Sequence, residues 1–120
     1  MGVARFREIA RGKILGDDTG LLKLLFHRET RKILGVHCIG ATATEIIHIG
    51  QTVMAFDGTI EYFRDAVFNY PTMAECYKVA AFDGLNKIAL EEECLTTGGK
   101  PLSNAVPVVP KRELPDVLAV

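Results

Sequence analysis

The sequence has no tryptophan, only three cysteines and no excess of either charge. Cys38, Cys76 and Cys94 are scattered without a Cys-x-x-Cys pair, so they predict neither a disulfide framework nor a zinc site and fit a reducing cytoplasm. Fourteen basic and fifteen acidic residues give a formal net charge of -1. This balance argues against a nucleic-acid-binding module, which would carry a basic patch or stripe.

Long apolar runs and glycine-rich motifs are missing as well. No run approaches the ~18 consecutive apolar residues of a membrane span, and residues 1–5 lack the apolar core of a secretion signal. The sequence contains no GxGxxG, Walker, GxSxG or HExxH motif. We therefore expect an intracellular chain that does not hold a nucleotide cofactor by itself.

Histidine and cysteine offer one conceivable set of metal ligands, His37-Cys38 with His48. Neighbouring residues of a strand point to opposite faces, so His37 and Cys38 cannot easily converge on one ion, and we expect no metal site. Cys76 lies near the start of a predicted helix, where a thiol pKa can be lowered. A buried structural cysteine is nevertheless the preferred interpretation of Cys76.

The composition, 48% hydrophobic and 24% charged over 120 residues, predicts one globular domain. The alternation in Leu21–His27 and the apolar run Ile33–Gly40 predict two strands joined by the charged loop Arg28–Lys32 as an antiparallel hairpin. Val3–Ile9 is a candidate third strand, and Gly16–Gly20 is typical of a turn. The expected fold class is α+β, an antiparallel β-sheet flanked by helices.

Residues 42 to 90 have helical periodicity. Thr42 with Glu45 indicates a capping box that begins an amphipathic helix, and Gly58 is expected to end it in the left-handed conformation. A short helix is expected from Thr59 to Val67. Asn69-Tyr70-Pro71 then interrupts the helical pattern, since the residue before a proline is disfavoured in the α region.

A last helix follows this interruption, with Thr72 and Glu75 forming a second capping-box pattern. On the residues alone, the segment 69–75 is explained as a turn, a proline that leads into a helix, and a cap. The helix is apolar over more than half its circumference, so we expect it to pack on two sides. We expect it to fray before Glu91-Glu92-Glu93, since acidic groups are unfavourable near a helix C-terminus. Its predicted apolar positions are Met73, Tyr77, Val79, Ala80, Ala81, Phe82, Gly84, Leu85 and Ile88.

The composition changes near residue 96, where four of the five prolines follow a Gly-Gly pair. Prolines lack the donor that helices and sheets use, so residues 96–120 are expected to form an extended tail. The domain itself is expected to span residues 1–95.

Several separated blocks, in order along the chain, resemble a known family. The sequence is similar to the C-terminal dimerisation domain of the pyridine nucleotide-disulfide oxidoreductases, and within that family to the soluble pyridine nucleotide transhydrogenase branch. The resemblance covers about residues 3 to 90. The blocks that carry it are Leu25–Thr30, Ile33–Cys38, Glu45–Gln51, Phe68–Glu75, Tyr77–Ala81 and Gly84–Asn86.

The resemblance implies a larger enzyme in which FAD-binding and NAD(P)-binding domains precede this one, each with its own glycine-rich loop. It also implies a homodimer, in which two copies of the domain pack against each other. We expect the contact to form through the last helix and the sheet, because the last helix carries an apolar stripe of Tyr77, Ala81, Phe82 and Leu85. The loop Tyr70-Pro71-Thr72 would reach the flavin of the partner subunit.

One position departs from the disulfide-reducing members of the family. They carry a histidine immediately before the Pro-Thr, held by a glutamate five residues later; here Tyr70 takes the histidine position while Glu75 remains. A phenol with a pKa near ~10 is a poor proton shuttle at neutral pH, so dithiol chemistry is disfavoured. Hydride transfer between nicotinamides through a flavin needs no thiol proton relay. No catalytic residue is therefore expected on this chain alone.

Three alternatives remain open at this point. The parent could resemble dihydrolipoamide dehydrogenase, which the missing histidine opposes. It could resemble mercuric reductase, which the absence of a vicinal cysteine pair at the C-terminus opposes. The chain could also act by itself as a non-catalytic homodimeric module.

Overall fold

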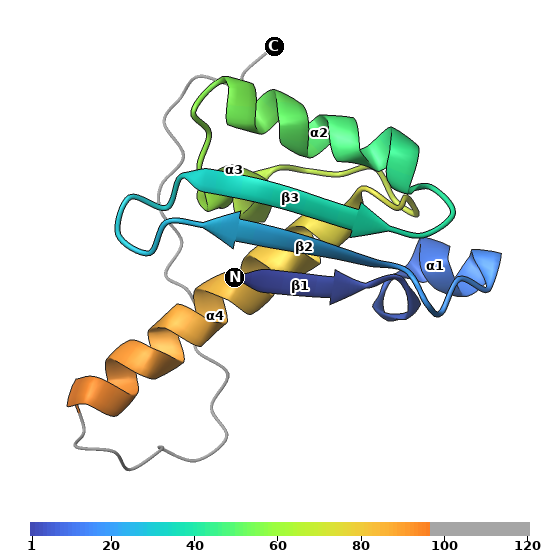
Figure 1. Cartoon of the computed structure of the whole chain (residues 1–120). Coiled ribbons are helices and arrows are strands. Elements are labelled where there is room, and N and C mark those ends of the chain that lie inside the picture. Colours follow the sequence, from blue (N-terminus) through green and yellow to red (C-terminus); the bar gives the residue numbers. More distant parts are fainter. Residues whose placement is uncertain (97–120) are drawn as a thin grey trace.

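Three antiparallel strands form a sheet in the order β1-β2-β3 (Figure 1). The computed structural model describes residues 1–96, with strands β1 (Gly2–Arg5), β2 (Leu21–Phe26) and β3 (Ile33–Ile39). The predicted hairpin is confirmed, because β2 and β3 pair in an antiparallel register across the charged loop. The predicted tail lies, apart from its first residue, outside the described part.

The predicted third strand is shorter than expected. β1 ends at Arg5, and a turn of 3-10 helix, η1 (Phe6–Glu8), follows it because the buried ring of Phe6 turns into the core. The backbone N–H of Phe6 donates to Gly20 O over 2.8 Å, which fixes this turn on the loop before β2. The helix that comes next, α1 (Ala10–Leu15), was not predicted, since its six residues form no apolar stripe.

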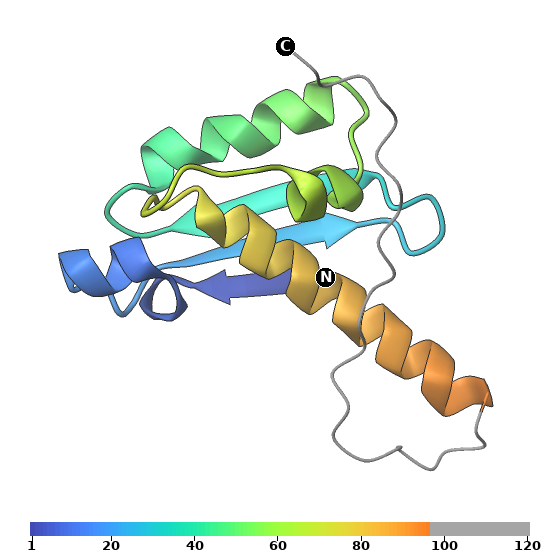
Figure 2. The same cartoon turned by 180° about the vertical axis from the view of Figure 1, so that it is seen from behind.

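The helices that follow β3 lie on one side of the sheet (Figures 1 and 2). α4 (Glu75–Thr96) packs on β1 and β2, α2 (Ala43–Ala55) packs on β3, and α3 (Ile60–Asp65) packs on α4. The predicted sheet flanked by helices is confirmed, with the qualification that α2, α3 and α4 share one side of the sheet, whereas α1 packs on η1. The inner face contributes Ala4, Leu22, Leu24 and half-buried Val36 and Cys38 to the core.

The ends of α2 differ from the predicted caps. Thr42 is the N-cap residue, but its hydroxyl makes no capping hydrogen bond; its carbonyl oxygen accepts from the N–H groups of Glu45 and Ile46 instead. At the other end Asp57, and not Gly58, adopts the left-handed conformation (φ 55°), which aspartate tolerates better than most residues. Gly58 instead lets the backbone come close to Val53, since its N–H donates to Val53 O over 2.8 Å.

The last helix has the predicted buried face but not the predicted length. Its buried positions include Tyr77, Ala80, Ala81, Gly84 and Leu85. The helix continues through the three glutamates to Thr96, so the expected fraying is wrong. An ion pair between Arg28 Nη1 and Glu91 Oε2, 2.6 Å apart, ties this part of the helix to the β2–β3 loop.

The same packing corrects the predicted dimer stripe. Tyr77, Ala81 and Leu85 are buried in the core of a single chain, where they contact the sheet and neighbouring helices. Only Phe82, at 40% exposure, remains available to a partner. The helix does pack on two sides, but β1 and β2 on one side and α3 on the other both belong to the same chain.

Candidate functional site

The segment predicted to face a flavin lies on the surface between α3 and α4. Tyr70 is 70% exposed, Pro71 is exposed, and the peptide bond between them is cis. Thr72 is half-buried, and its hydroxyl donates to Asn69 O over 2.7 Å. The loop therefore exposes the Tyr70 phenol at the surface. It can position a neighbouring group but does not enclose one.

Glu75 begins α4, and the predicted Thr72–Glu75 capping box is wrong, because within residues 1–96 no hydrogen bond joins the side chain of either residue to the backbone of the other. The Glu75 Oε2 atom is buried without a hydrogen-bond partner. Within residues 1–96, no hydrogen bond joins Glu75 to Tyr70. The structure thus brings the two residues into one segment without making them a proton-relay pair.

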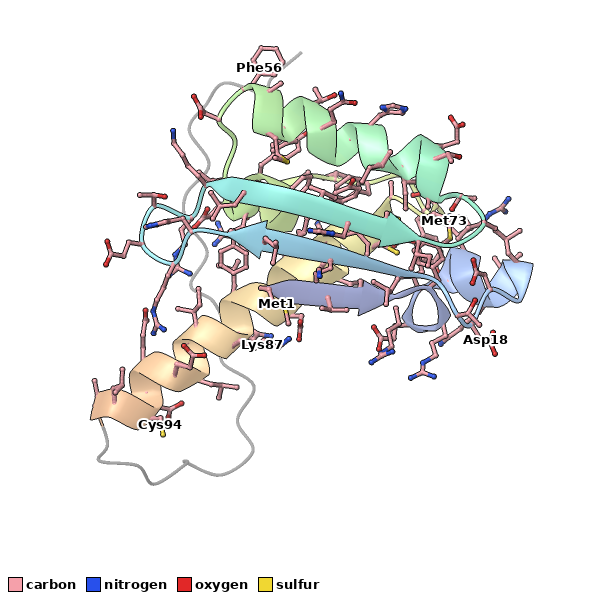
Figure 3. All side chains as sticks on the ribbon, viewed as in Figure 1. Met1, Asp18, Phe56, Met73, Lys87 and Cys94 are labelled. Atoms are coloured by element: carbon pink, nitrogen blue, oxygen red, sulfur yellow. The ribbon has the colours of Figure 1, made fainter. Side chains whose placement is uncertain are left out.

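Both ends of the exposed segment are fixed by the core. Before it, the ring of Phe68 is stacked on Tyr77 with centroids 6.4 Å apart. After it, Met73 is buried next to the turn that leads from β3 into α2 (Figure 3). The Met73 carbonyl oxygen accepts from the N–H of Cys76 over 3.1 Å, which closes the turn into α4.

Tyr77 is the central anchor of this end of the molecule. Its buried hydroxyl donates to Ile46 O over 2.8 Å and accepts from the N–H of Gly50 over 3.0 Å, so it bridges two backbone groups one turn apart in α2. Burial raises the pKa of Tyr77 to about 12. Sequence reasoning placed Tyr77 on the buried face but missed this bridge; the glycine in the middle of α2 was the available signal.

Cys38 and Cys76 are not activated thiols. Cys76 is fully buried, and burial raises its pKa to about 12; burial likewise raises the pKa of Cys38 to about 11. A thiolate is the reactive form, so both thiols are poor nucleophiles at neutral pH. The structural interpretation of Cys76 is confirmed. Cys94 is exposed near the end of α4.

The structure does not bring the conceivable metal ligands together. His37 is exposed on the outer face of β3, Cys38 points into the core, and Nδ1 of His48 is hydrogen-bonded to Gln51 Oε1 over 2.8 Å. Among residues 1–96, no three side chains of histidine, cysteine or acid are grouped to hold a metal ion. In the same part of the chain, no helix is long and apolar enough to cross a membrane.

An apolar surface cavity of about 230 Å³ lies at the far end of α2 from Met73 (Figure 3). It opens between the end of α2 and α3, and Phe56 projects beside it with 83% of its surface exposed. Sequence reasoning did not predict it. Its lining residues are Thr52, Val53, Phe56, Gly58 and Tyr62.

Comparison with known families gives a match over residues 1–81 to the dimerisation domain of pyridine nucleotide-disulphide oxidoreductases. The chain belongs to this family. The resemblance seen in the sequence is therefore confirmed. The sheet and the helices that lie on one side of it form this dimerisation domain.

Similar curated proteins within the family are soluble pyridine nucleotide transhydrogenases. The chain is 59% identical over 91 residues to a soluble pyridine nucleotide transhydrogenase of Yersinia enterocolitica and 58% identical to one of Yersinia pestis. Each alignment covers 73% of this chain and 20% of the relative. The chain thus spans about a fifth of the length of these relatives.

A solved structure agrees with the fold. The HOCl-induced flavoprotein disulfide reductase RclA from Escherichia coli superposes with a TM-score of 0.62 at 25% identity. The match covers 66% of this chain and 18% of RclA. A segment with this architecture therefore occurs in a flavoprotein disulfide reductase.

Proposed function

We propose that this dimerisation domain serves an FAD-dependent NAD(P) transhydrogenase of the cytoplasm. In this proposal, two copies form a homodimer, and the loop Tyr70-Pro71-Thr72 of one subunit borders the flavin of the other. The observation that carries the proposal is the outward phenol of Tyr70, held on a segment that the core fixes at both ends, in a chain 59% identical to a transhydrogenase.

The chemistry of the described residues favours hydride transfer over dithiol reduction. Disulfide reduction needs an acid-base group beside a reactive thiol, whereas Tyr70 has no hydrogen bond to Glu75 and the thiols of Cys38 and Cys76 are buried with raised pKa values. Hydride transfer depends mainly on the positions of the reacting rings. The FAD and NAD(P) would be held by other domains of the parent, since this chain has no phosphate-binding glycine loop.

We propose a dimer contact that differs from the predicted stripe on α4, because Tyr77, Ala81 and Leu85 of that stripe are buried in their own chain. The segment before α4 and the first half of α4 leave these apolar side chains open to a partner: Val67 at 95%, Tyr70 at 70% and Phe82 at 40% exposure. Burying them on association would remove apolar surface from water at about 25 cal/mol per Å². In a two-fold dimer the same surface lies on both subunits, so Val67 and Phe82 would pack on the partner's copy of this surface while Tyr70 points toward the partner's flavin.

The test uses a chimeric enzyme in which residues 1–91 replace the corresponding segment of the Yersinia enterocolitica relative. The chimera should form a flavin-containing dimer and transfer hydride between nicotinamide analogues. Tyr70→Phe should lower kcat/KM by less than about tenfold, because a general acid-base group contributes ~10²–10⁴-fold. Tyr62→Phe, at another exposed tyrosine, is the matched control.

Two results would contradict the proposal. A folded, flavin-loaded chimeric dimer without transhydrogenase activity would show that this domain does not support the reaction. A loss of a hundredfold or more in Tyr70→Phe, with flavin content and dimerisation intact, would mean that the phenol takes part in the chemistry. Reduction of a disulfide substrate by the chimera would favour the disulfide-reductase alternative.

A further inference from the structure

Two exposed aromatic side chains border the cavity at the end of α2. Phe56 follows the last residue of α2 and is 83% exposed, and Tyr62 on α3 is 53% exposed. The ring of Tyr62 is held in place, because it packs edge-on against the buried ring of Phe63 with centroids 5.5 Å apart. An apolar cavity bordered by exposed aromatic rings is the kind of surface on which proline-rich segments bind.

This chain contains a proline-rich segment of its own. Residues 107–112 have the sequence Pro-Val-Val-Pro-Lys-Arg, in which two prolines three positions apart are followed by two cations. We call residues 107–112 the PxxP segment. A polyproline II helix has three residues per turn, so this spacing suits a conformation with both prolines on one side. Proline already restricts the backbone, so binding in that conformation costs little entropy.

The border of the cavity also carries a carboxylate that can take a cation. Glu61 lies half-buried in the first turn of α3 and forms no ion pair within residues 1–96. The other charges of this region are already paired: Asp57 with Lys32 over 3.1 Å, and Arg64 with Asp65 over 2.6 Å. Charge complementarity at the edge of a contact selects its direction and register.

The PxxP segment can reach the cavity of its own chain. Two ion pairs place α4 and the end of α2 at the same β2–β3 loop, Arg28 with Glu91 and Lys32 with Asp57. Figures 1 and 2 show α2 and α4 ending toward the side of the sheet that carries this loop. Residues 97–106, which lead to the PxxP segment, can span about 35 Å when extended.

We propose that the PxxP segment binds in the cavity of its own chain, with its prolines on Phe56 and Tyr62 and with Arg112 beside Glu61. The contact removes the two exposed rings from water. Because the segment is tethered, its effective concentration at the cavity is about millimolar, so a weak contact suffices. The PxxP segment lies beyond residues 1–81, the range matched by the family, and the contact stays within one subunit.

A disulfide within the full 120-residue chain tests the contact. Cys94→Ser first removes the exposed native thiol; Cys38 and Cys76 lie in the core. Thr52→Cys then places a thiol on the cavity lining, and Val109→Cys places one in the PxxP segment without changing either proline. A glutathione redox buffer gives the equilibrium constant for closing this disulfide, and peptide mass spectrometry identifies the bond.

The matched control moves one thiol to the other end of the same helix. Thr44→Cys replaces Thr52→Cys, since Thr44 is also an exposed threonine of α2. Both positions share the tether, the helix and the partner thiol at position 109. The disulfide should therefore form at least about tenfold more favourably with position 52 than with position 44, because docking raises the local concentration of the partner thiol.

Substitutions in the disulfide background test the two parts of the contact. Phe56→Ala should lower the equilibrium constant by more than about fivefold, because it removes an aromatic anchor. Arg112→Glu should lower it by about two- to fivefold, as expected for an exposed ion pair, and adding Glu61→Lys should restore it. Asp18→Lys is the control for a change of charge, since Figure 3 shows Asp18 and Phe56 at opposite ends of the molecule.

Three results would overturn the proposal. Equal equilibrium constants at positions 52 and 44 would mean that the PxxP segment does not bind in the cavity. A disulfide that joins two copies, seen as a covalent dimer on non-reducing electrophoresis, would assign the cavity to the segment of another chain. An equilibrium constant that changes with neither Phe56→Ala nor Arg112→Glu would rule out the proposed contacts. Circular dichroism checks that each variant is folded.

Discussion

The Tyr77 hydroxyl makes two buried hydrogen bonds that join α4 to α2. In a regular α-helix the N–H of residue 50 bonds to the carbonyl oxygen of residue 46. Here the phenol bridges those two groups, with distances of 3.0 Å to Gly50 N and 2.8 Å to Ile46 O. Tyr77→Phe keeps the ring in its stack on Phe63, with centroids 4.6 Å apart, and removes only the hydroxyl.

The expected loss follows from what the substitution leaves unpaired. One buried donor and one buried acceptor lose their shared partner, and such a loss destabilises a protein by ~1–3 kcal/mol. The lower end of this range applies if the N–H of Gly50 and the carbonyl oxygen of Ile46 pair with each other in the variant, as in a regular helix. Urea unfolding followed by far-UV circular dichroism measures the change. Tyr62→Phe, at an exposed tyrosine, should change the free energy of unfolding by less than about 0.5 kcal/mol.

A second substitution tests the geometry directly. A Cβ atom added at Gly50 would lie 2.6 Å from Val36 Cγ2 and 2.8 Å from Tyr77 Oη. Gly50→Ala is therefore expected to destabilise by ~1–3 kcal/mol through overpacking. In the Tyr77→Phe background the contact with the oxygen is gone, so Gly50→Ala should cost at least about 0.5 kcal/mol less. Additive effects, or a Tyr77→Phe variant as stable as the wild type, would refute the bridge.

Three further predictions concern titratable groups. Alkylation of the native chain should label Cys94 quickly and Cys38 and Cys76 slowly, and mass spectrometry after denaturation should show all three labelled; fast native labelling of Cys76 would contradict its burial. Burial raises the pKa of Cys38 to about 11 and the pKa values of Cys76 and Tyr77 to about 12. Their neutral forms therefore stabilise the fold below pH 9. The unfolding midpoint should fall as the pH rises from 9 to 12, because these groups ionise more readily in the unfolded chain. Hydrogen bonds from loop backbone N–H groups lower the pKa of Asp17, so Asp17→Ala should lower the thermal midpoint at pH 7, and this difference should shrink as the pH falls below about 4 and Asp17 is protonated.

Much of the sheet could be predicted from the sequence because its signals are local. The alternation of Leu22 and Leu24 with Leu21 and Lys23 defines the faces of β2, and the charged loop after Phe26 defines the hairpin. Helix capping was less predictable. Thr-x-x-Glu occurs twice with the correct spacing, yet neither threonine side chain makes the predicted capping hydrogen bond, since that bond depends on backbone angles that the four letters do not determine.

The dimer stripe was mispredicted for a more general reason. An apolar helix surface indicates burial, but the pattern cannot say whether the same chain or a second copy covers it. Tyr77, Ala81 and Leu85 contact their own core, so the surface left for association is set by less patterned residues such as Phe82. Sequence reasoning did not predict, for the converse reason, that the outer face of the sheet is left without a helix. Leu21 and Leu25 alternate like core residues although no described helix covers them.

The position of Tyr70 depends on the same core that joins the helices. The exposed segment begins after Phe68, which is stacked on Tyr77, and it ends at Met73, which is buried just before α4. Inside the segment, the Thr72 hydroxyl makes a short-range hydrogen bond to Asn69 O, which does little by itself to fix the shape of the segment. The direction of the phenol is therefore set by apolar residues on either side of it. In this domain, the contacts that stabilise α4 against α2 also position the residue that would meet the flavin of a partner subunit.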